Sequence, residues 1–258
     1  MPFVDISSHR IEYERIEARG SVRPQLVFLH EGLGSIATWR DFPERVARET
    51  RCDAIVYSRY GYGNSDPLAE RRGARYMHDE ALVALPRLLD HLGVERPILI
   101  GHSDGGSIAL IHAGAGARAV GAVVTLAAHV LVEEISVASI AAAKTAYEST
   151  DLRARLARYH ADVDSAFWGW NRIWLAPEFR DWNIEEYLPR IRCPVLAIQG
   201  VDDEYGTMEQ VRRIEAGVAD VELLPLQRCR HSPHRDQPDA VLAAIARFVD
   251  RVVRQPLV

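Results

Sequence analysis

A serine held between glycines, directly after a short apolar segment, is the feature that most constrains this chain. Residues 98–110 read ILIGHSDGGSIAL, so an apolar run leads into Gly-His-Ser-Asp-Gly-Gly and then at once into a segment of helical character. Gly-x-Ser-x-Gly between a strand and a helix is typical of a nucleophile elbow, whose cramped backbone raises the serine hydroxyl above the strand end. A phosphate-binding turn or a plain tight turn is the alternative. We predict the elbow, with Ser103 as nucleophile.

Short apolar runs recur along the chain, and segments of helical period separate them. Continuous apolarity is typical of parallel strands covered on both faces, whereas alternation within residues 3–16 predicts an antiparallel pair with a turn near Ser7 and Ser8. Strands that alternate with helices predict an α/β fold, a doubly wound and mostly parallel sheet. The continuous runs are QLVFLH (25–30), DAIVYS (53–58), PILIG (97–101), VGAVVTLA (120–127), PVLAIQG (194–200) and VELLPL (221–226).

Residues 129–190 separate two of these strands by far more chain than an ordinary crossover needs. Three short segments in this stretch, VASIAAAKTAYES, DLRARLARYHADV and SAFWGWNRIW, have helical character. We therefore predict a helical cap at residues 129–190. It would be inserted into one domain whose core comprises residues 1–128 and 191–258.

Composition disfavours several classes of protein. The chain has 258 residues, a net charge of −5 and no run of Lys or Arg, so nucleic acid and anionic membranes are not expected as partners. No apolar stretch approaches the roughly 18 residues of a membrane span, and the first residues do not resemble a signal peptide. Three scattered cysteines fit a reducing cytoplasm. We expect a cytoplasmic monomer or homodimer that acts on a small molecule, with no metal and no cofactor.

Candidates for an acid and a base follow Ser103 in the order expected for a serine hydrolase of this architecture. A serine hydroxyl at its ordinary pKa needs such a base. Two acids, Asp202 and Asp203, follow a predicted strand, and two histidines, His231 and His234, follow the last one. We predict that His231 takes the Ser103 proton and that Asp203 orients the imidazole; Asp202 and His234 are the alternatives.

Two backbone N–H groups are candidates for binding a tetrahedral oxyanion. One belongs to Asp104, the residue after the proposed nucleophile. The other is expected in the segment LHEGLGS, where Gly32 and Gly34 allow close approach of the backbone. We favour the Gly32 N–H; alternatively, these glycines only shape a turn between a strand and a helix.

Five segments together resemble the α/β-hydrolase fold superfamily over nearly the whole chain. They are FLHEGLGS, YSRYGYGNSD, GHSDGGSIAL, AIQGVDDEYG and RCRHSPHRDQP. The resemblance implies a cofactor-free hydrolase with Asp203 and His231 as acid and base. The chain departs from the family at Glu31 and Arg230, where the family commonly has glycine. These departures bear on the segment LHEGLGS (29–35), called the oxyanion loop below, and on the loop of His231.

The segments GHSDGG and AAHVLVEEIS are most similar to valacyclovir hydrolase and its relatives. In that group the acid beside the nucleophile binds the α-amino group of the substrate. Asp104 occupies the matching position, so the resemblance implies an ammonium-binding role for it. The alternative is that its carboxylate pairs with a residue of the cap or with water.

Aromatic side chains crowd the end of the predicted cap. Positions 167, 170 and 174 share one helical face, and position 168 lies on another. Trp168, Trp170 and Trp174 are our candidates for substrate contacts, and the alternative is that they pack the cap onto the core. Tyr147, Tyr159 and His160 could also contribute.

Taken together, these features predict an enzyme that cleaves a carboxylic ester, a lactone or a related acyl bond of a small organic substrate through an acyl-enzyme. Two narrower alternatives stay open: hydrolysis of α-amino acid esters or amides, with Asp104 as the ammonium site, and C–C bond hydrolysis of ring-cleavage diketones. A protein of another class, a non-catalytic binding protein on the same scaffold, is the further alternative. The presence of Ser103, Asp203 and His231 together favours the enzyme.

Overall fold

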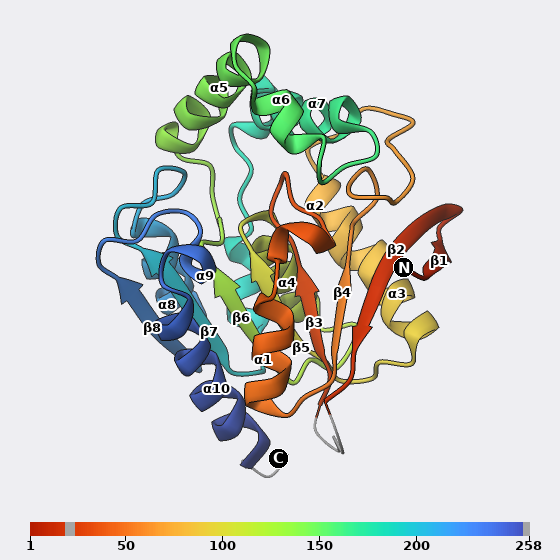
Figure 1. Cartoon of the computed structure of the whole chain (residues 1–258). Helices are drawn as coiled ribbons and strands as arrows, with labels where there is room; N and C mark the ends of the chain where they lie inside the picture. Colours follow the sequence, from red (N-terminus) through yellow and green to blue (C-terminus); the bar gives the residue numbers. More distant parts are fainter. Residues whose placement is uncertain (19–23, 255–258) are drawn as a thin grey trace.

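A sheet of eight described strands runs through the centre of the protein, which Figure 1 shows as a computed structural model. The structure describes residues 1–18 and 24–254. The strand order is β1-β2-β4-β3-β5-β6-β7-β8, and every pairing from β4 to β8 is parallel. The predicted doubly wound, mostly parallel sheet is therefore confirmed. The strands are β1 (Phe3–Ile6), β2 (His9–Ile16), β3 (Leu26–Leu29), β4 (Ala54–Tyr57), β5 (Ile98–His102), β6 (Ala122–Leu126), β7 (Val195–Gly200) and β8 (Val221–Leu226).

The two N-terminal strands form the predicted antiparallel hairpin, and β2 in turn pairs antiparallel with β4. Ser7 and Ser8 have φ values of 52° and 70°. Two consecutive positive φ angles are typical of the tight two-residue turns that match the twist of a hairpin. This hairpin places its turn beside the helical segment that follows residue 75.

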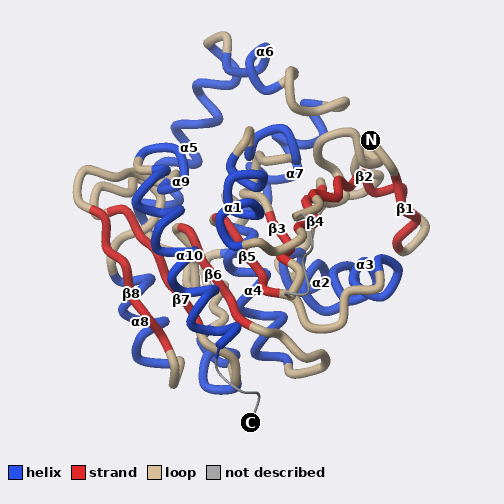
Figure 2. The backbone as a smooth tube through the Cα atoms, turned by 60° about the horizontal axis from the view of Figure 1, so that its bottom comes forward, coloured by secondary structure: helices blue, strands red, loops and turns tan. Residues whose placement is uncertain are grey.

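The inner strands are buried on both faces, because helices cover the sheet on each side, as Figure 2 shows. Alternate side chains of one strand enter different apolar clusters: Ile98 and Ile100 pack in the cluster of α1 and α10, and Leu99 packs in the opposite cluster. The edge strand β8 is only half buried. The helices beside the sheet are α1 (Phe42–Thr50), α2 (Tyr76–Asp79), the π-helical turn η2 (Glu80–Ala84), α3 (Leu85–Leu92), α4 (Asp104–Ala115), α8 (Glu209–Gly217), α9 (Pro233–Asp236) and α10 (Pro238–Arg254), and the short turn η1 is Ile36–Trp39.

Between β6 and β7 the chain leaves the sheet and forms several helices. Figure 1 places α5, α6 and α7 above the carboxyl ends of the strands. The chain then returns to the sheet, where the backbone of Tyr187 packs closely against Gly114 of α4. The division of the chain into a core and a cap at residues 129–190 stays a prediction. These elements are α5 (Glu134–Ser149), α6 (Leu152–Leu156), α7 (Val163–Trp174), η3 (Pro177–Phe179) and η4 (Glu185–Arg190).

The described residues include neither a helix that could span a membrane nor a cluster of side chains that could hold a metal. Within residues 1–18 and 24–254, no helix combines the length and the apolar character that a bilayer crossing requires. In the same ranges, no group of three or more His, Cys, Asp and Glu side chains is arranged to hold a metal ion.

Candidate active site

Ser103 stands at the turn between β5 and α4 in a strained backbone conformation. Its φ and ψ are 51° and −118°, values that a non-glycine residue adopts only when its surroundings impose them. The turn is held by the Ser103 N–H, which donates to the Leu126 carbonyl at 2.8 Å, and by the Gly106 N–H, which donates to the Ser103 carbonyl at 2.8 Å. The side chain therefore lies at the carboxyl end of β5, the edge where ligands bind in open α/β sheets.

The glycines on either side of Ser103 are required by close contacts between backbones. A Cβ atom on Gly101 would overlap the carbonyl oxygen of Gly105, and a Cβ atom on Gly105 would overlap the carbonyl oxygen of Leu29. Neither carbonyl belongs to a flexible side chain, so a larger residue could be accommodated only by moving a strand or the start of α4. The motif is thus explained by packing of the turn against β3.

Gly105→Ala is expected to lower the free energy of unfolding by about 3 kcal/mol, because the added methyl group meets backbone atoms that cannot move aside. Gly73→Ala is the matched control, since no atom lies within 4 Å of a Cβ built on Gly73. That control should change stability by no more than about 1 kcal/mol. Urea unfolding of both variants measures the difference, and equal midpoints would contradict this account of the turn.

Ser103, Asp203 and His231 come together across three loops at the carboxyl edge of the sheet. The Nε2 atom of His231 lies 3.0 Å from the Ser103 Oγ atom, and its Nδ1 atom lies 2.9 Å from both carboxylate oxygens of Asp203. The alternatives lie elsewhere: Asp202 is exposed, and the His234 ring packs near the rings of Trp39, Phe42 and His102. The geometry thus selects one acid and one imidazole.

Asp203 is buried and fixed by donors other than His231. Gln199 donates to its Oδ2 at 2.8 Å, and the N–H groups of Tyr205 and Gly206 donate to its Oδ1 at 2.8 and 3.2 Å. Burial alone would raise the pKa of Asp203, but the hydrogen bond and charge of His231, with the Tyr205 N–H, lower the pKa below its ordinary value. An ionised Asp203 can only accept, so the His231 Nδ1 must donate, and its Nε2 lone pair then faces the Ser103 hydroxyl.

The two backbone N–H groups predicted to bind an oxyanion are available. Within the described part of the chain, neither the Gly32 N–H nor the Asp104 N–H donates a hydrogen bond to another protein group. Asp104 is the first residue of α4, where the helix dipole favours negative charge. Gly32 lies against the indole of Trp170, whose ring a Cβ atom at position 32 would overlap.

The side chain of Asp104 faces away from solvent and has polar partners within the protein. The Tyr76 hydroxyl donates to its Oδ2 at 2.7 Å, and Nη2 of Arg59 lies 3.7 Å from the same oxygen. The Trp174 indole donates to the Tyr76 hydroxyl at 2.9 Å, which links Asp104 to α7. The Oδ1 atom has no hydrogen-bond partner among the described residues. A substrate-binding role for this carboxylate stays a prediction.

The three tryptophans of α7 occupy different environments. Trp170 and Trp174 are buried, and Trp170 is the one that contacts the oxyanion loop, at Gly32. Trp168 is partly exposed on another face, where the guanidinium of Arg172 lies 5.3 Å from its ring. Of these candidates for substrate contacts, Trp170 therefore lies against Gly32, and Trp174 reaches the Asp104 carboxylate through the Tyr76 hydroxyl.

His102 and Glu31 join the oxyanion loop to the loop of His231, a link that the sequence did not indicate. The His102 Nε2 atom lies 2.7 Å from the backbone carbonyl of His231, and its Nδ1 atom lies 3.3 Å from a carboxylate oxygen of Glu31. Burial opposes ionisation of Glu31, but His102 and the charge of Arg235 hold its pKa well below the ordinary value. The unusual acid at position 31 was the only available signal, since no sequence pattern connects it with residues 102 and 231.

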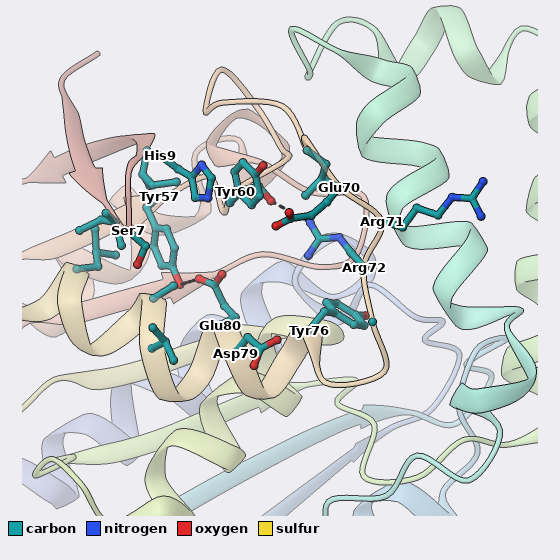
Figure 3. A pocket seen from close by; sticks show the side chains of 17 residues that line it. Ser7, His9, Tyr57, Tyr60, Glu70, Arg71, Arg72, Tyr76, Asp79 and Glu80 are labelled. Atoms are coloured by element: carbon teal, nitrogen blue, oxygen red, sulfur yellow. Dashed lines mark hydrogen bonds between the residues drawn. The ribbon is translucent and has the colours of Figure 1, made fainter.

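A cavity of about 380 Å³ lies between the N-terminal hairpin and the segment of α2, η2 and α3 (Figure 3). Aromatic rings line it, and the Tyr57 hydroxyl donates to Glu80 at 2.9 Å inside it. Burial raises the pKa of Glu80, although Arg59, Tyr57 and Arg72 oppose the shift. Ser103, Asp203 and His231 are not among the lining residues. Tyr76 belongs to both regions, because its ring lines the cavity and its hydroxyl reaches Asp104.

Comparison with protein families gives one clear match. The model described as "Alpha/beta hydrolase family" matches residues 26–244. A proline iminopeptidase of Lactobacillus acidophilus is 30% identical over 112 residues, which are 43% of this chain and 36% of that protein. The match therefore spans little more than a third of the curated relative's length.

Solved structures of related architecture cover nearly the whole chain. The enol-lactonase from Burkholderia xenovorans LB400 has a TM-score of 0.76 at 17% identity and covers 96% of this chain and 100% of its own. A carboxylesterase structure from Nitrososphaera gargenis has a TM-score of 0.77 at 23% identity, with 97% and 98% covered. The proline iminopeptidase from Mycobacterium smegmatis has a TM-score of 0.73 at 19% identity, with 97% and 98% covered. At these identities the likeness establishes the fold alone.

Proposed function

The chain belongs to the alpha/beta hydrolase family, and from this premise we propose that it is a cofactor-free serine hydrolase. Its substrate would be a small carboxylic ester, a lactone or a related acyl compound, which makes it a carboxylic ester hydrolase. The observation that carries the proposal is the position of His231, 3.0 Å from the Ser103 hydroxyl and 2.9 Å from the Asp203 carboxylate. This arrangement turns an ordinary alcohol into a nucleophile.

In the first step, the Ser103 Oγ atom attacks the acyl carbon while its proton moves to the Nε2 atom of His231. The carbonyl electron pair moves onto oxygen, and the N–H groups of Gly32 and Asp104 stabilise this oxyanion. Asp203 stabilises the imidazolium and keeps its Nδ1 proton in place. Each oxyanion donor in such a site contributes on the order of 10²–10³ in kcat.

Collapse of the tetrahedral intermediate breaks the bond to the leaving group, which takes the proton from His231. The product is an acyl-enzyme on Ser103 and a free alcohol; in a lactone, this alcohol remains attached to the acyl group. Water then attacks the acyl-enzyme, His231 accepts the proton of the water, and collapse returns that proton to Ser103. The carboxylic acid leaves and the enzyme is restored.

A second candidate function is hydrolysis of substrates that carry an α-amino group. The curated relatives named proline iminopeptidase and the position of Asp104 beside the nucleophile favour it. Against it, the Arg59 guanidinium already lies 3.7 Å from the Asp104 carboxylate. A substrate ammonium would have to approach a carboxylate whose charge a buried cation already balances. We therefore place esters without an amino group first.

A panel of model substrates tests this order. It contains p-nitrophenyl esters, lactones, and a phenylalanine ester paired with its 3-phenylpropanoate analogue, which lacks the amino group. We expect hydrolysis of the neutral esters and a kcat/KM for the analogue at least equal to that of the phenylalanine ester. A fluorophosphonate should also label Ser103 stoichiometrically, as shown by mass spectrometry of the digested protein.

Two results would change the proposal. A phenylalanine ester preferred by about tenfold or more, with the preference lost in Asp104→Asn, would favour the second candidate, because about 1.4 kcal/mol would then come from that carboxylate. No turnover of any substrate together with no labelling of Ser103 would indicate a binding protein on this scaffold.

A further inference from the structure

Arg59 is buried directly behind the proposed oxyanion site, although it has no part in the proton transfer described above. It follows β4, and its side chain is 1% exposed. Its Nη2 atom donates to the Glu31 carbonyl at 2.9 Å and to the His30 carbonyl at 3.2 Å, and it lies 3.7 Å from the Asp104 carboxylate. One nitrogen atom thus contacts both segments that supply the oxyanion donors.

The contact with the Glu31 carbonyl matters because this carbonyl and the Gly32 N–H belong to one peptide group. In a trans peptide the two groups point in opposite directions. The carbonyl accepts three donors: Arg59 Nη2, the His30 Nδ1 atom at 2.7 Å, and the Gly34 N–H at 3.0 Å. With the carbonyl held on one side, the Gly32 N–H is held on the other, and hydrogen bonds to the carbonyl polarise the whole peptide.

The backbone N–H of Arg59 determines which nitrogen of His30 carries the proton, and thus that His30 donates to the Glu31 carbonyl. The Arg59 N–H donates to the Nε2 atom of His30 at 3.0 Å, so Nε2 is an acceptor. Burial, with the nearby charge of Arg59, holds the pKa of His30 well below its ordinary value, and the neutral ring carries a single proton. That proton must be on Nδ1, which donates to the Glu31 carbonyl.

The order of the strands explains why one residue can reach both segments. In the sheet, β3 lies between β4 and β5. The loop after β3 carries Gly32, the loop after β4 carries Arg59, and the turn after β5 carries Ser103 and Asp104. Parallel strands end at the same edge, so the Arg59 side chain extends beneath the middle loop to the Asp104 carboxylate.

We propose that Arg59 is a positioning residue of this reaction: it holds the Gly32 and Asp104 N–H groups in the arrangement that binds the oxyanion. The inference rests on the proposed function and deepens it.

The rest of the guanidinium distinguishes this role from a purely structural one. Arginine has five N–H donors, and a guanidinium whose only role was to stabilise the fold would be expected to use most of them in hydrogen bonds. Here Nε and Nη1 have no hydrogen-bond partner among the described residues, and the guanidinium lies 4.9 Å from the centre of the Tyr62 ring. The hydrogen bonds of the side chain are concentrated on the oxyanion loop.

The test compares Arg59→Met/Asp104→Asn with Asp104→Asn alone, so that the Asp104 carboxylate is not left buried without its counterion. Both proteins are assayed with an ester and with its thionoester, in which sulfur replaces the carbonyl oxygen. Sulfur accepts hydrogen bonds poorly, so the thionoester gains little from an oxyanion site. We expect the Arg59 substitution to lower kcat for the ester about 10- to 100-fold with KM within about threefold. The ratio of ester to thionoester rates should fall at least about fivefold.

Arg72→Met is the matched control. The Arg72 guanidinium lies 4.8 Å from the centre of the same Tyr62 ring, but it donates to the Tyr60 carbonyl and not to the oxyanion loop. The rate ratio should stay at the wild-type value in this variant. If the double variant does not fold, Arg59→Lys, which keeps the charge but not the geometry of the fork, decides by the same ratio.

Two results would contradict this proposal, and they can be distinguished from each other. In the first, the Arg59 variant keeps the wild-type ratio of ester to thionoester rates, and its kcat per fluorophosphonate-reactive Ser103 is also unchanged. This result would overturn the role of Arg59 and leave the proposed function intact. A wild-type protein that neither hydrolyses esters nor reacts with the fluorophosphonate would overturn the proposed function, and the role of Arg59 with it.

Discussion

Ser103→Ala should lower kcat/KM for ester hydrolysis by about 10⁴-fold or more, the largest effect expected of any single substitution in this protein. The variant lacks the atom that attacks the acyl carbon, while His231 and the oxyanion donors remain. Water could then be activated only without a covalent intermediate, and such a site retains a small part of the rate. Initial rates with a p-nitrophenyl ester measure the loss.

Ser107→Ala is the control for this experiment. Ser107 lies one turn further along α4, is also buried, and donates to the His129 carbonyl at 2.6 Å. It does not contact His231 or Asp203 in any described interaction, so its variant should still form the fluorophosphonate adduct. An active Ser103→Ala protein, or an adduct found on a residue other than Ser103, would contradict the assignment of the nucleophile.

The elements that could be predicted from sequence are those whose signals are local. Continuous apolar runs predicted β3 to β7 because strands covered on both faces have no polar side to show. The spacing within α7 separated Phe167, Trp170 and Trp174, which are buried, from Trp168, which is partly exposed. Each pattern belongs to a single strand or helix, and it does not depend on how the elements are arranged around one another.

Other features depend on contacts between segments, and the sequence gives little sign of them. Leu82, Leu85, Leu88, Leu89 and Leu92 are spaced as on one face of a regular helix, but the structure has a π-helical turn at Glu80–Ala84 before α3. Glu80 faces Tyr57 there, and its carboxylate accepts the tyrosine hydroxyl. A π-helical turn changes the hydrogen-bond register without changing the apolar period enough to be noticed.

The proposed catalytic residues could likewise be predicted from local signals, whereas the contacts of the positioning residue Arg59 could not. Ser103, Asp203 and His231 could be predicted because each comes within five residues after the end of a strand, and the carboxyl ends of parallel strands meet at one edge. The contacts of Arg59 with the Glu31 carbonyl and Asp104 depend on β3 being placed between β4 and β5, an order that does not follow the sequence. Without the strand order, no pairing of these residues could be preferred.

The second large effect on kcat is expected at Asp203, and it distinguishes this acid from the adjacent Asp202. Asp203→Asn is expected to lower kcat by about 10³- to 10⁴-fold with little change in KM. The amide carries no charge to stabilise the imidazolium of His231. Its NH₂ group can also occupy the place of Oδ2, where a donor would face the His231 Nδ1 atom and favour the tautomer whose Nε2 proton blocks acceptance from Ser103.

Asp202→Asn removes the same charge from the neighbouring residue and is the matched control. Its carboxylate is exposed, so solvent screens its interaction with the imidazolium, and kcat should stay within about threefold of the wild-type value. Steady-state kinetics of the two variants, on protein shown to be folded by circular dichroism, measure the difference. A loss in Asp202→Asn with Asp203→Asn unaffected would mean that His231 is oriented by the other acid. Since the Asp203 carboxylate is held by Gln199 and by two backbone N–H groups, such an exchange would require the loop after β7 to refold.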